Sequence, residues 1–369
     1  MENLSMFDLL PEEEAQQFKK LKSTDWKWSM ANDYPKEKNG LRVFSCFACG
    51  GGSTMGYKLA GCDVVGCCEI DPKMNETYIK NHNPKHNFCM DIREFNKIPN
   101  YDLPEELFNL DILDGSPPCT TFSMAGDREE SWGKKKKFRE GQAEQTLDDL
   151  SFVFIETVEK LKPKVVIMEN VEGLIKGEAW TYVQKIYKQF NDIGYRVRHW
   201  LLKGENMGVP QKRNRVFFIA LNRDNPCDVT KLDMTFNYEP ITYGEIKDGV
   251  CELGEHLKIK QYLNNAIKGE SDLGETTLRL LNERKCFSCK LIYPNSIVPT
   301  ILANCEGGFH LLDFEEKQMI SSKSIVASQT FPKDYDFGNM KVGYICGMSV
   351  PPIMIKRIVT RLIESGVFG

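Results

Sequence analysis

Residues 41–69 read LRVFSCFACGGGSTMGYKLAGCDVVGCCE. A short apolar run at 43–47 is followed by three glycines and by a stretch with helical spacing at 54–60. A second apolar run follows at 64–68 and ends at Glu69. Strands that alternate with helical segments are typical of βαβ units, whose strands pair in parallel. The segment therefore predicts the start of an α/β domain with a mostly parallel sheet.

The same alternation continues to residue 221 and then stops. We expect further helices at 73–80, 147–161 and 179–190, and further strands at 111–113, 165–168, 196–202 and 216–221. Residues 222–295 are polar and show no sustained period, whereas helical spacing returns at 350–362. The predicted organisation is an N-terminal extension at 1–40 that acts as a packing arm, an α/β domain at 41–221, a smaller inserted domain at 222–295 and a segment at 296–369 that returns to the α/β domain.

The composition is that of a soluble protein with a sizeable core. Of 369 residues, 41% are hydrophobic and 27% are charged, which is ordinary for a globular chain and too apolar for a disordered one. The 48 basic and 52 acidic residues give a net charge of −4, so any nucleic-acid surface must be local. The N-terminus has no basic region, no apolar run reaches the roughly 18 residues of a membrane helix, and the cysteines are scattered. We therefore expect a cytoplasmic protein with reduced thiols and no membrane segment.

The glycine-rich segment FACGGG at 47–52 predicts a ligand-binding loop, because glycine lets the backbone approach a ligand closely at the start of a helix. Glu69 ends the next strand, where a carboxylate can accept hydrogen bonds from both hydroxyls of a ribose. Asp91 is placed to accept a hydrogen bond from an adenine amino group. A plain tight turn is the alternative interpretation. The spacing differs from the dinucleotide motif GxGxxG, which argues against NAD.

A cysteine follows two prolines in the sequence DGSPPCTTFS at 114–123. Cys119 is therefore predicted on a stiff turn at the carboxyl edge of a strand, where a nucleophile belongs in an open α/β sheet. Since the thiolate is the reactive form, the site must lower the thiol pKa with positive charge or a helix N-terminus. An inert cysteine is the alternative, and the flanking prolines favour the nucleophile.

Two further polar segments each adjoin an apolar strand. The run at 165–168 leads to Glu169, and an acid in that place is costly unless it faces a ligand or partner. Next to a buried thiolate, such an acid can have a raised pKa and donate a proton. In the sequence QKRNR, Gln211, Arg213 and Arg215 point to one side of an extended chain, which suits phosphate or a polar base edge. A solvated face is the alternative for this row.

The order and spacing of these motifs resemble the DNA cytosine-5 methyltransferase family. Pro-Cys at 118–119 is followed by Glu-Asn-Val at 169–171, by QxRxR at 211–215 and by Gly-Met-Ser-Val-Pro-Pro at 347–352. The resemblance implies a methyltransferase domain that binds S-adenosylmethionine and a target-recognition domain at 222–295. A short chain without a large regulatory extension favours a prokaryotic or phage member.

The resemblance also implies a role for each matching residue. Cys119 would add to carbon 6 of the target cytosine, and Glu169 would hold and protonate ring nitrogen 3, with Asn170 positioning that loop. Arg215 would contact the flipped base, supported by the other two members of QxRxR. Flipping follows because the thiol must reach the 5,6 bond, at a cost on the order of a few kcal/mol of unstacking. The residues that match the cofactor-binding motifs are Phe47, Cys49, Gly50, Gly51, Gly52, Glu69, Ile70, Asp91, Ile92, Pro118, Met348 and Ser349.

Residues 124–145 correspond to the loop that closes over bound DNA in the family. Phosphate contacts, which give affinity without sequence information, would come from Lys134, Lys135, Lys136, Lys137 and Arg139. A solvated face is again the alternative. With Gln211 these residues are the predicted DNA contacts. The implied partner is double-stranded DNA, a cognate restriction endonuclease is a further candidate partner, and the chain is expected to be a monomer.

The chain departs from the family pattern at several positions. Cys49 replaces the first glycine of FxGxGG, and Ser45 stands where an acid is common. Met348 replaces the frequent asparagine of GNSVPP, which removes one hydrogen bond on the cofactor side. Lys323 and Ser324 replace an arginine-glutamate pair, so the support of the recognition domain must be rearranged. None of the five is a predicted catalytic residue.

Other interpretations carry distinct signatures. A transfer-RNA cytosine-5 methyltransferase of the same family usually has Cys-Phe-Thr after Glu-Asn-Val, and residues 171–221 contain no such tripeptide. A non-catalytic DNA-binding relative would have lost the catalytic residues, and an oxidoreductase would carry GxGxxG. Cys46 and Cys49, like Cys286 and Cys289, have the CxxC spacing of a zinc site, but the pairs belong to different domains and we expect no metal.

Overall fold

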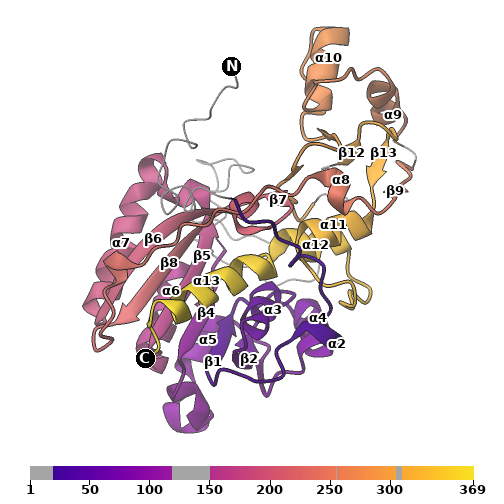
Figure 1. Ribbon diagram of the computed structural model, residues 1–369. Coiled ribbons are helices and arrows are strands. Elements are labelled where there is room, and N and C mark those ends of the chain that lie inside the picture. Colours follow the sequence, from indigo (N-terminus) through magenta and orange to yellow (C-terminus); the bar gives the residue numbers. More distant parts are fainter. Residues whose placement is uncertain (1–19, 119–149, 255, 305–309) are drawn as a thin grey trace, which may run out of the picture.

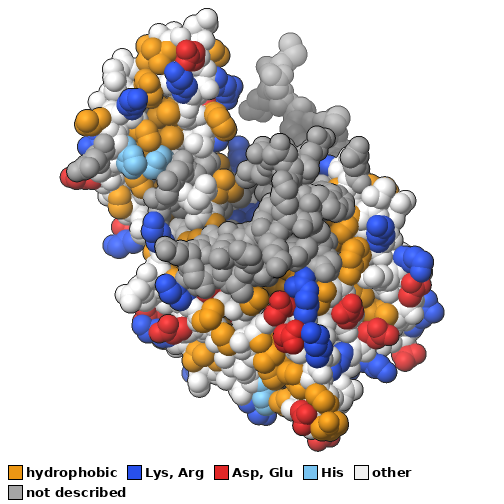
Figure 2. All heavy atoms as spheres, turned by 180° about the vertical axis from the view of Figure 1, so that it is seen from behind, with side chains coloured by type: hydrophobic (Ala, Val, Ile, Leu, Met, Phe, Trp, Pro, Cys, Tyr) orange, Lys and Arg blue, Asp and Glu red, His pale blue; other side chains and the backbone are white. Residues whose placement is uncertain are grey.

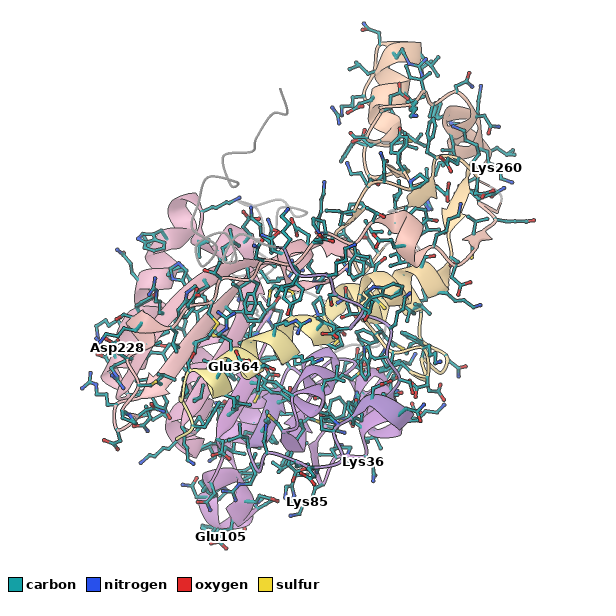
Figure 3. The ribbon with its side chains drawn as sticks, in the orientation of Figure 1. Lys36, Lys85, Glu105, Asp228, Lys260 and Glu364 are labelled. Carbon is teal, nitrogen blue, oxygen red and sulfur yellow. The ribbon has the colours of Figure 1, made fainter. Side chains whose placement is uncertain are left out.

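Figure 1 shows the computed structural model of the chain, which describes residues 20–118, 150–254, 256–304 and 310–369. A large α/β unit carries a smaller unit that stands out from one end. Charged side chains such as those of Lys36, Lys85 and Glu105 point outward from the α/β unit, and Lys260 points outward from the smaller one (Figure 3).

Seven strands form the main sheet in the order β3-β2-β1-β4-β5-β8-β6. Their bounds are β1 Arg42–Cys46, β2 Asp63–Cys68, β3 His86–Phe88, β4 Ile112–Gly115, β5 Val165–Val171, β6 Tyr195–Lys203 and β8 Asn214–Asn222. The first five strands in this order pair in parallel, whereas β8 runs antiparallel to both β5 and β6. The predicted α/β fold with a mostly parallel sheet is confirmed.

Helices cover both faces of the sheet, and alternate residues of each central strand point to opposite faces. Val165 and Ile167 of β5 lie in one hydrophobic cluster, and Val166 and Met168 lie in the other. Against the first face lie α3 Gly52–Leu59, α4 Pro72–His82, α12 Val342–Met348 and α13 Pro352–Glu364. Against the second lie α5 Ile92–Lys97, α6 Leu150–Leu161 and α7 Trp180–Asp192. The helices and strands predicted up to residue 221 are present, with ends shifted by a few residues.

The last predicted helix, at 350–362, is α13, which packs on α3 (Figure 1). Within the described part of the chain, Val342–Glu364 is the one stretch long and apolar enough to cross a membrane. It comprises the two helices α12 and α13, and 67% of its most apolar window is buried inside the protein. Its hydropathy is therefore that of a core element.

The smaller unit has its own sheet and its own core. Four short strands, β9 Val250–Cys251, β10 Lys290–Ile292, β12 Leu311–Asp313 and β13 Gln318–Ile320, pair in the order β10-β12-β13-β9. With them lie α9 Leu257–Asn264 and α10 Leu273–Leu281. Its core includes Leu253, Leu263, Leu273, Leu291 and Leu312. Apolar side chains also remain on its surface, where Leu257 is 77% and Phe287 62% exposed, and Figure 2 shows such side chains on this unit.

The structure shifts the boundaries of the inserted domain. Part of the predicted range belongs to the core of the large unit, namely Val229, Leu232, Met234, Ile241 and Ile246. In the other direction, β12 and β13 lie beyond residue 295 and complete the small sheet. The small unit therefore spans approximately residues 247–320. Its strands of two or three residues are too short to show alternation, and the buried residues before them are too isolated to show a period.

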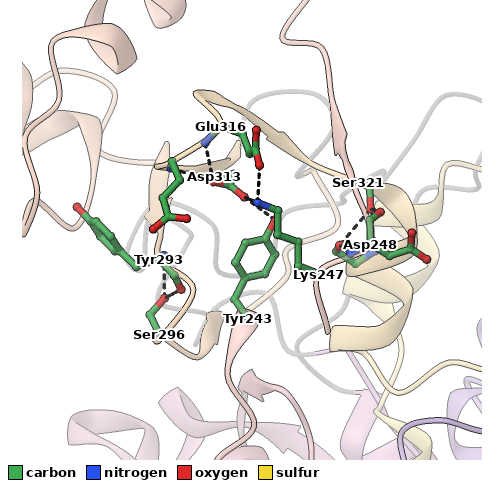
Figure 4. A network of polar contacts seen from close by, with 10 residues as sticks. Tyr243, Lys247, Asp248, Tyr293, Ser296, Asp313, Glu316 and Ser321 are labelled. Carbon is green, nitrogen blue, oxygen red and sulfur yellow. Dashed lines mark hydrogen bonds and ion pairs between the residues drawn. The ribbon is translucent and has the colours of Figure 1, made fainter. Parts of the chain in front are cut away.

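A polar network joins the small unit to the large one (Figure 4). Lys247 follows α8 (Tyr243–Ile246), and its Nζ lies 2.8 Å from Asp313 and 2.9 Å from Glu316. The hydroxyl of Tyr243 donates to the same Asp313 carboxylate at 3.0 Å. Because Asp313 is buried, its charge would be costly without partners, and these donors offset that cost.

Serine hydroxyls hold the next residue of this junction. Ser321 donates to the backbone oxygen of Asp248 at 2.6 Å, and Ser324 accepts the Asp248 backbone N–H at 3.0 Å. Both serines belong to the start of α11 (Ser322–Ser328), and Lys323 lies 3.6 Å from the Asp248 carboxylate. The Ser321 and Ser324 hydroxyls and the Lys323 ammonium group therefore support the junction, which includes both positions, 323 and 324, that depart from the family pattern.

Residues 20–40 pack against the C-terminal part of the chain. Trp28 is buried, and its indole N–H donates to the Thr330 carbonyl at 2.8 Å. Asp334 accepts the backbone N–H of Met30 at 2.9 Å, and α2 (Met30–Asp33) follows directly. Asp25 pairs with Arg357 of α13. Residues 1–19 of the extension lie outside the described residues.

Candidate active site

Two of the predicted motifs meet at one edge of the main sheet. Because β4 and β5 are parallel neighbours, with Gly115 opposite Met168, the segments that follow them leave the sheet together. The Asn170 side-chain amide donates to the Pro117 carbonyl at 3.2 Å, so it connects the Glu-Asn-Val segment directly to the proline turn. Cys119 lies outside the described residues, one position after the last described residue of this turn, Pro118.

The third motif reaches the same edge through an ion pair. Arg215 on β8 lies opposite Val171 of the antiparallel strand β5, and its Nε is 2.8 Å from Oε1 of Glu169. Their side chains are only 14% and 12% exposed. Burial lowers the pKa of Arg215, and the Glu169 charge opposes that shift. The Glu169 carboxylate is therefore held by the Arg215 guanidinium through Oε1.

The rest of QxRxR does not form a surface row with Arg215. Gln211 and Arg213 are buried, because β7 (Gln211–Lys212) pairs with β11 (Val298–Pro299) beneath the surface. The Gln211 amide donates to the Gln329 side chain at 2.7 Å and accepts the Ile301 N–H at 3.0 Å. The Gln211 amide therefore bonds inside the protein, and its contact with DNA stays a prediction.

Arg213 supports the site from behind. Its guanidinium donates to the carbonyls of Ile301, Gly347 and Ser349 at 3.2, 3.1 and 2.8 Å. The C-terminal motif at 347–352 is thereby held against the strand that carries Arg215. With these three hydrogen bonds the Arg213 guanidinium acts as a structural link inside the protein. It is engaged by these carbonyls, and among the described residues it makes no hydrogen bond or ion pair with Glu169, Asn170 or Pro117.

Arg213→Met is therefore expected to lower the free energy of unfolding by about 3 kcal/mol, because the carbonyls of Ile301 and Gly347 lose the guanidinium donor and that of Ser349 keeps only the Gln329 amide. Urea unfolding of both chains measures the effect. Arg223→Met is the matched control, since Arg223 is exposed and bonds only to Asn191. Equal stability of the Arg213 and Arg223 variants would contradict the assigned link.

The glycine-rich loop joins β1 to α3 in an irregular conformation. Phe47 and Cys49 have positive φ values of 55° and 49°, and Gly51, at 80°, caps α3. A Cβ on Gly51 would lie 2.0 Å from His82, and one on Gly52 would lie 2.2 Å from the Val350 carbonyl. Glycine is therefore required where the loop meets α4 and the C-terminal motif.

Glu69 stands between this loop and the next helix. Its two carboxylate oxygens accept the backbone N–H groups of Cys49 at 2.7 Å and Asp71 at 2.9 Å. Burial raises the pKa of Glu69, and these two hydrogen bonds oppose the shift. Each oxygen keeps a second lone pair, so the Glu69 carboxylate can also accept a hydrogen bond from a ligand hydroxyl.

The C-terminal motif contacts the glycine loop, because Ser349 donates to Cys49 Sγ at 3.7 Å. Met348, the other predicted cofactor residue of that motif, is 36% exposed.

A small cavity opens beside Glu69. Its lining contains Phe47, Cys68, Ile70, Met90, Asp91, Ile92 and Leu150. Four of these were predicted as cofactor residues from the sequence, and Cys68, Met90 and Leu150 were missed although two of them adjoin predicted positions. The Asp91 carboxylate caps α5 by accepting the Arg93 N–H at 2.8 Å. Apolar side chains with one carboxylate at the edge have the chemistry to contact an aromatic base that carries an amino group, but the cavity itself, at about 10 Å³, has room for no more than a water molecule.

Sequence reasoning also missed two supports of the glycine loop. Tyr335 donates to the Gly50 carbonyl at 2.7 Å, and Nε2 of His82 lies 3.2 Å from the same oxygen. Burial lowers the pKa of His82 to about 3, so the ring is neutral at physiological pH. Neither residue belongs to a motif, and only the tertiary fold brings them to the loop. Among the described His, Cys, Asp and Glu residues, no group of three or more is arranged to hold a metal ion.

The comparison with known families decides what this arrangement represents. The profile of the C-5 cytosine-specific DNA methylase family matches residues 41–364. The chain belongs to this family. The match begins at β1 and ends with α13, so it includes every element that contributes to the edge and the cavity described above. The resemblance inferred from the four motifs is thereby confirmed.

Individual relatives of the chain include bacterial and phage proteins. The chain is 30% identical over 225 residues to the type II methyltransferase M.NgoPII of Neisseria gonorrhoeae, covering 60% of this chain and 58% of that protein. It is 26% identical to M.HindV of Haemophilus influenzae over 88% of this chain and 97% of that protein. With M.FnuDI and M.DdeI the matched part is 56% and 52% of the relative, so the chain spans little more than half the length of several curated relatives.

Solved structures share the fold. A putative DNA modification methyltransferase encoded within an Escherichia coli prophage superposes with a TM-score of 0.59 at 19% identity, covering 88% of this chain and 99% of that one. A variant of Spodoptera frugiperda DNMT2 superposes with a TM-score of 0.58 at 15% identity, covering 88% of this chain and 100% of that one. These similarities confirm the α/β methyltransferase fold of the C-5 methylase family.

Proposed function

We propose that the chain transfers a methyl group from S-adenosylmethionine to carbon 5 of a cytosine in a specific sequence of double-stranded DNA. One observation carries the proposal: the proline turn that leads to Cys119, the Glu169–Asn170 segment and Arg215 meet at a single sheet edge through the 3.2 Å and 2.8 Å contacts described above. The family membership gives these three motifs their chemical meaning.

The residues present fit the cofactor. The apolar residues around the small cavity and the Asp91 carboxylate have the chemistry to contact an adenine ring with its amino group once the cavity widens, and Glu69 beside them has lone pairs for the two ribose hydroxyls. Gly50, Gly51 and Gly52 bring the backbone close to the same place. When bound there, S-adenosylmethionine supplies a methyl group made electrophilic by the sulfonium centre.

The protein groups would make the cytosine reactive in a fixed order. The Cys119 thiolate adds to carbon 6, and a proton held between Glu169 and ring nitrogen 3 neutralises the charge that develops on the ring. Carbon 5 then becomes the nucleophile that accepts the methyl group. Loss of the carbon 5 proton and departure of the thiolate restore the aromatic ring. Arg215 fixes the Glu169 carboxylate and lies near the base edge, while Asn170 keeps the turn in place.

This chemistry requires the cytosine to leave the double helix, because both faces of the 5,6 bond must be reached. Lys134, Lys135, Lys136, Lys137 and Arg139 are proposed phosphate contacts and lie outside the described residues. The small unit is the proposed recognition domain. We further propose that the chain is a cytoplasmic monomer, with a cognate restriction endonuclease as a candidate partner.

Labelled S-adenosylmethionine offered with duplex DNA or with transfer RNA tests the substrate. The expected result is label in acid-precipitable duplex DNA and none in transfer RNA. Bisulfite sequencing of DNA from cells that express the chain then gives the modified base and site, as protected cytosines at one short motif. Label in transfer RNA alone would show that transfer RNA, and not DNA, is the substrate. Label in neither nucleic acid would refute the proposed function.

A further inference from the structure

The proposed reaction leaves one buried acid near the site without a role. Asp114 on β4 is 2% exposed, and its carboxyl group is surrounded by hydroxyls. Ser45 donates to Oδ2 at 2.7 Å, Tyr57 donates to Oδ1 at 3.1 Å, and Ser53 also bonds to the group. Three hydroxyls from β1 and α3 therefore converge on a single carboxyl.

The position of this carboxyl connects the two loops of the site. Asp114 is the register partner of Ser45 across the β1–β4 pair. Ser45 lies at the end of β1, directly before the glycine loop, and Ser53 and Tyr57 belong to α3, directly after it. Asp114 itself precedes the proline turn by two residues. The same group therefore touches both sides of the cofactor loop from the strand that leads to Cys119.

Ser45 is also the position at which an acid is common in the family pattern that the sequence resembles. We propose that Asp114 is a positioning residue that supplies this carboxyl group from the neighbouring strand and thereby holds the glycine loop against the turn that carries Cys119. The inference deepens the proposed function and rests on it, since the loop is taken as the cofactor site. The carboxyl group thus comes from the neighbouring strand β4, and Ser45 on β1 donates a hydrogen bond to it.

The ionisation of Asp114 can be measured through the dependence of the protein's stability on pH. Burial raises the pKa of Asp114 to about 7 from an ordinary 3.8, although its hydroxyl partners oppose the shift. Because the folded-state pKa is the higher one, this group's contribution to stability is complete below about pH 4 and is lost as the pH rises through 7. The other titratable groups that face it are Cys46 of β1, Tyr57 of α3, Tyr78 of α4 and Glu169 of β5.

A four-variant cycle tests the displaced carboxyl: the parent chain, Ser45→Asp, Asp114→Ser, and both together. Asp114→Ser leaves the hydroxyls of Ser53 and Tyr57 without their acceptor, and Ser45→Asp puts two carboxyls side by side. Each single change is expected to weaken S-adenosylmethionine binding, measured by calorimetry, about tenfold. The double variant, which restores one carboxyl, is expected to return to within about threefold of the parent.

Asp111 provides the matched control. It is a buried acid at the other end of the β4 region and accepts from Lys164 and from the Arg42 backbone. Ser45→Asp combined with Asp111→Ser is expected to give no recovery. Recovery there, or a double Ser45–Asp114 variant as weak as its two single changes combined, would overturn the proposal.

Urea unfolding between pH 5 and pH 8 gives a readout that needs no cofactor. The parent chain and the swapped double variant are expected to lose unfolding free energy over this range through the buried carboxyl, and Asp114→Asn, which keeps the size of the side chain, is expected to lose less. An Asp114→Asn profile identical to the parent's would overturn the assignment of Asp114. A parent chain that binds no S-adenosylmethionine but shows the expected pH profiles would instead refute the proposed function.

Discussion

Cys119→Ser is expected to abolish methyl transfer to DNA while leaving the binding of S-adenosylmethionine unchanged. The hydroxyl of serine is a far weaker nucleophile at neutral pH than a thiolate, so addition to carbon 6 fails. Glu69 and the residues that line the small cavity come from β2, α5, α6 and the segments after β1, β2 and β3, and Cys119 is not one of them. Transfer of label from the cofactor and calorimetric binding measure the two effects separately.

Cys89→Ser is the matched control for that variant, since Cys89 is exposed and belongs to no motif. Its methyl transfer should equal that of the parent chain. The parent, but neither a Cys119→Ser chain nor a cofactor-free mixture, should become covalently trapped on a duplex containing 5-fluorocytosine at the modified site, because fluorine blocks the last elimination. Turnover by the Cys119→Ser chain would remove the nucleophile assignment.

The large unit could be predicted from the sequence because its strands are long and apolar on both faces. Val165–Val171 is buried through Met168 and then turns polar at Glu169, so both the strand and its functional end are visible in the order of residue types. Parallel pairing then places Pro117 and Asn170 at one edge without any further information. The small unit lacks such a signal, because β9 has two residues and its partner β13 has three.

The errors at the site have a physical cause as well. Period-two alternation places Gln211, Arg213 and Arg215 on one side, but the chain changes strands between the second and third of them. Gln211 and Arg213 are buried where β7 pairs with β11, and a pairing partner 87 positions away (Val298 opposite Gln211, 298 − 211) is not visible in a local pattern. Asp114 was overlooked for the same reason, since its significance depends on the register with Ser45.

Glu169→Gln is expected to lower the rate of methyl transfer roughly 10²–10⁴-fold, the usual contribution of a proton-transfer group. Glutamine keeps the length of the side chain and can still donate a hydrogen bond to ring nitrogen 3, but it cannot transfer the proton that the ring needs. Since the interaction strengthens only as the ring gains charge, kcat should fall far more than the KM for DNA rises. Steady-state kinetics on the duplex identified by bisulfite sequencing measure both.

Glu169→Gln is also expected to lower stability, because it removes the carboxylate that pairs with the Arg215 guanidinium. Removing its partner leaves a charge whose side chain is only 14% exposed, so the variant should also lose about 2 kcal/mol of unfolding free energy. Glu172→Gln is the matched control: it removes a carboxylate three residues away that pairs with Lys176 and Asn214 and lies off the proposed reaction path. That variant should keep its kcat. A Glu169→Gln chain with normal kcat, or equal losses of kcat in both variants, would show that Glu169 acts only through the fold, and the proton would then have to come from another group.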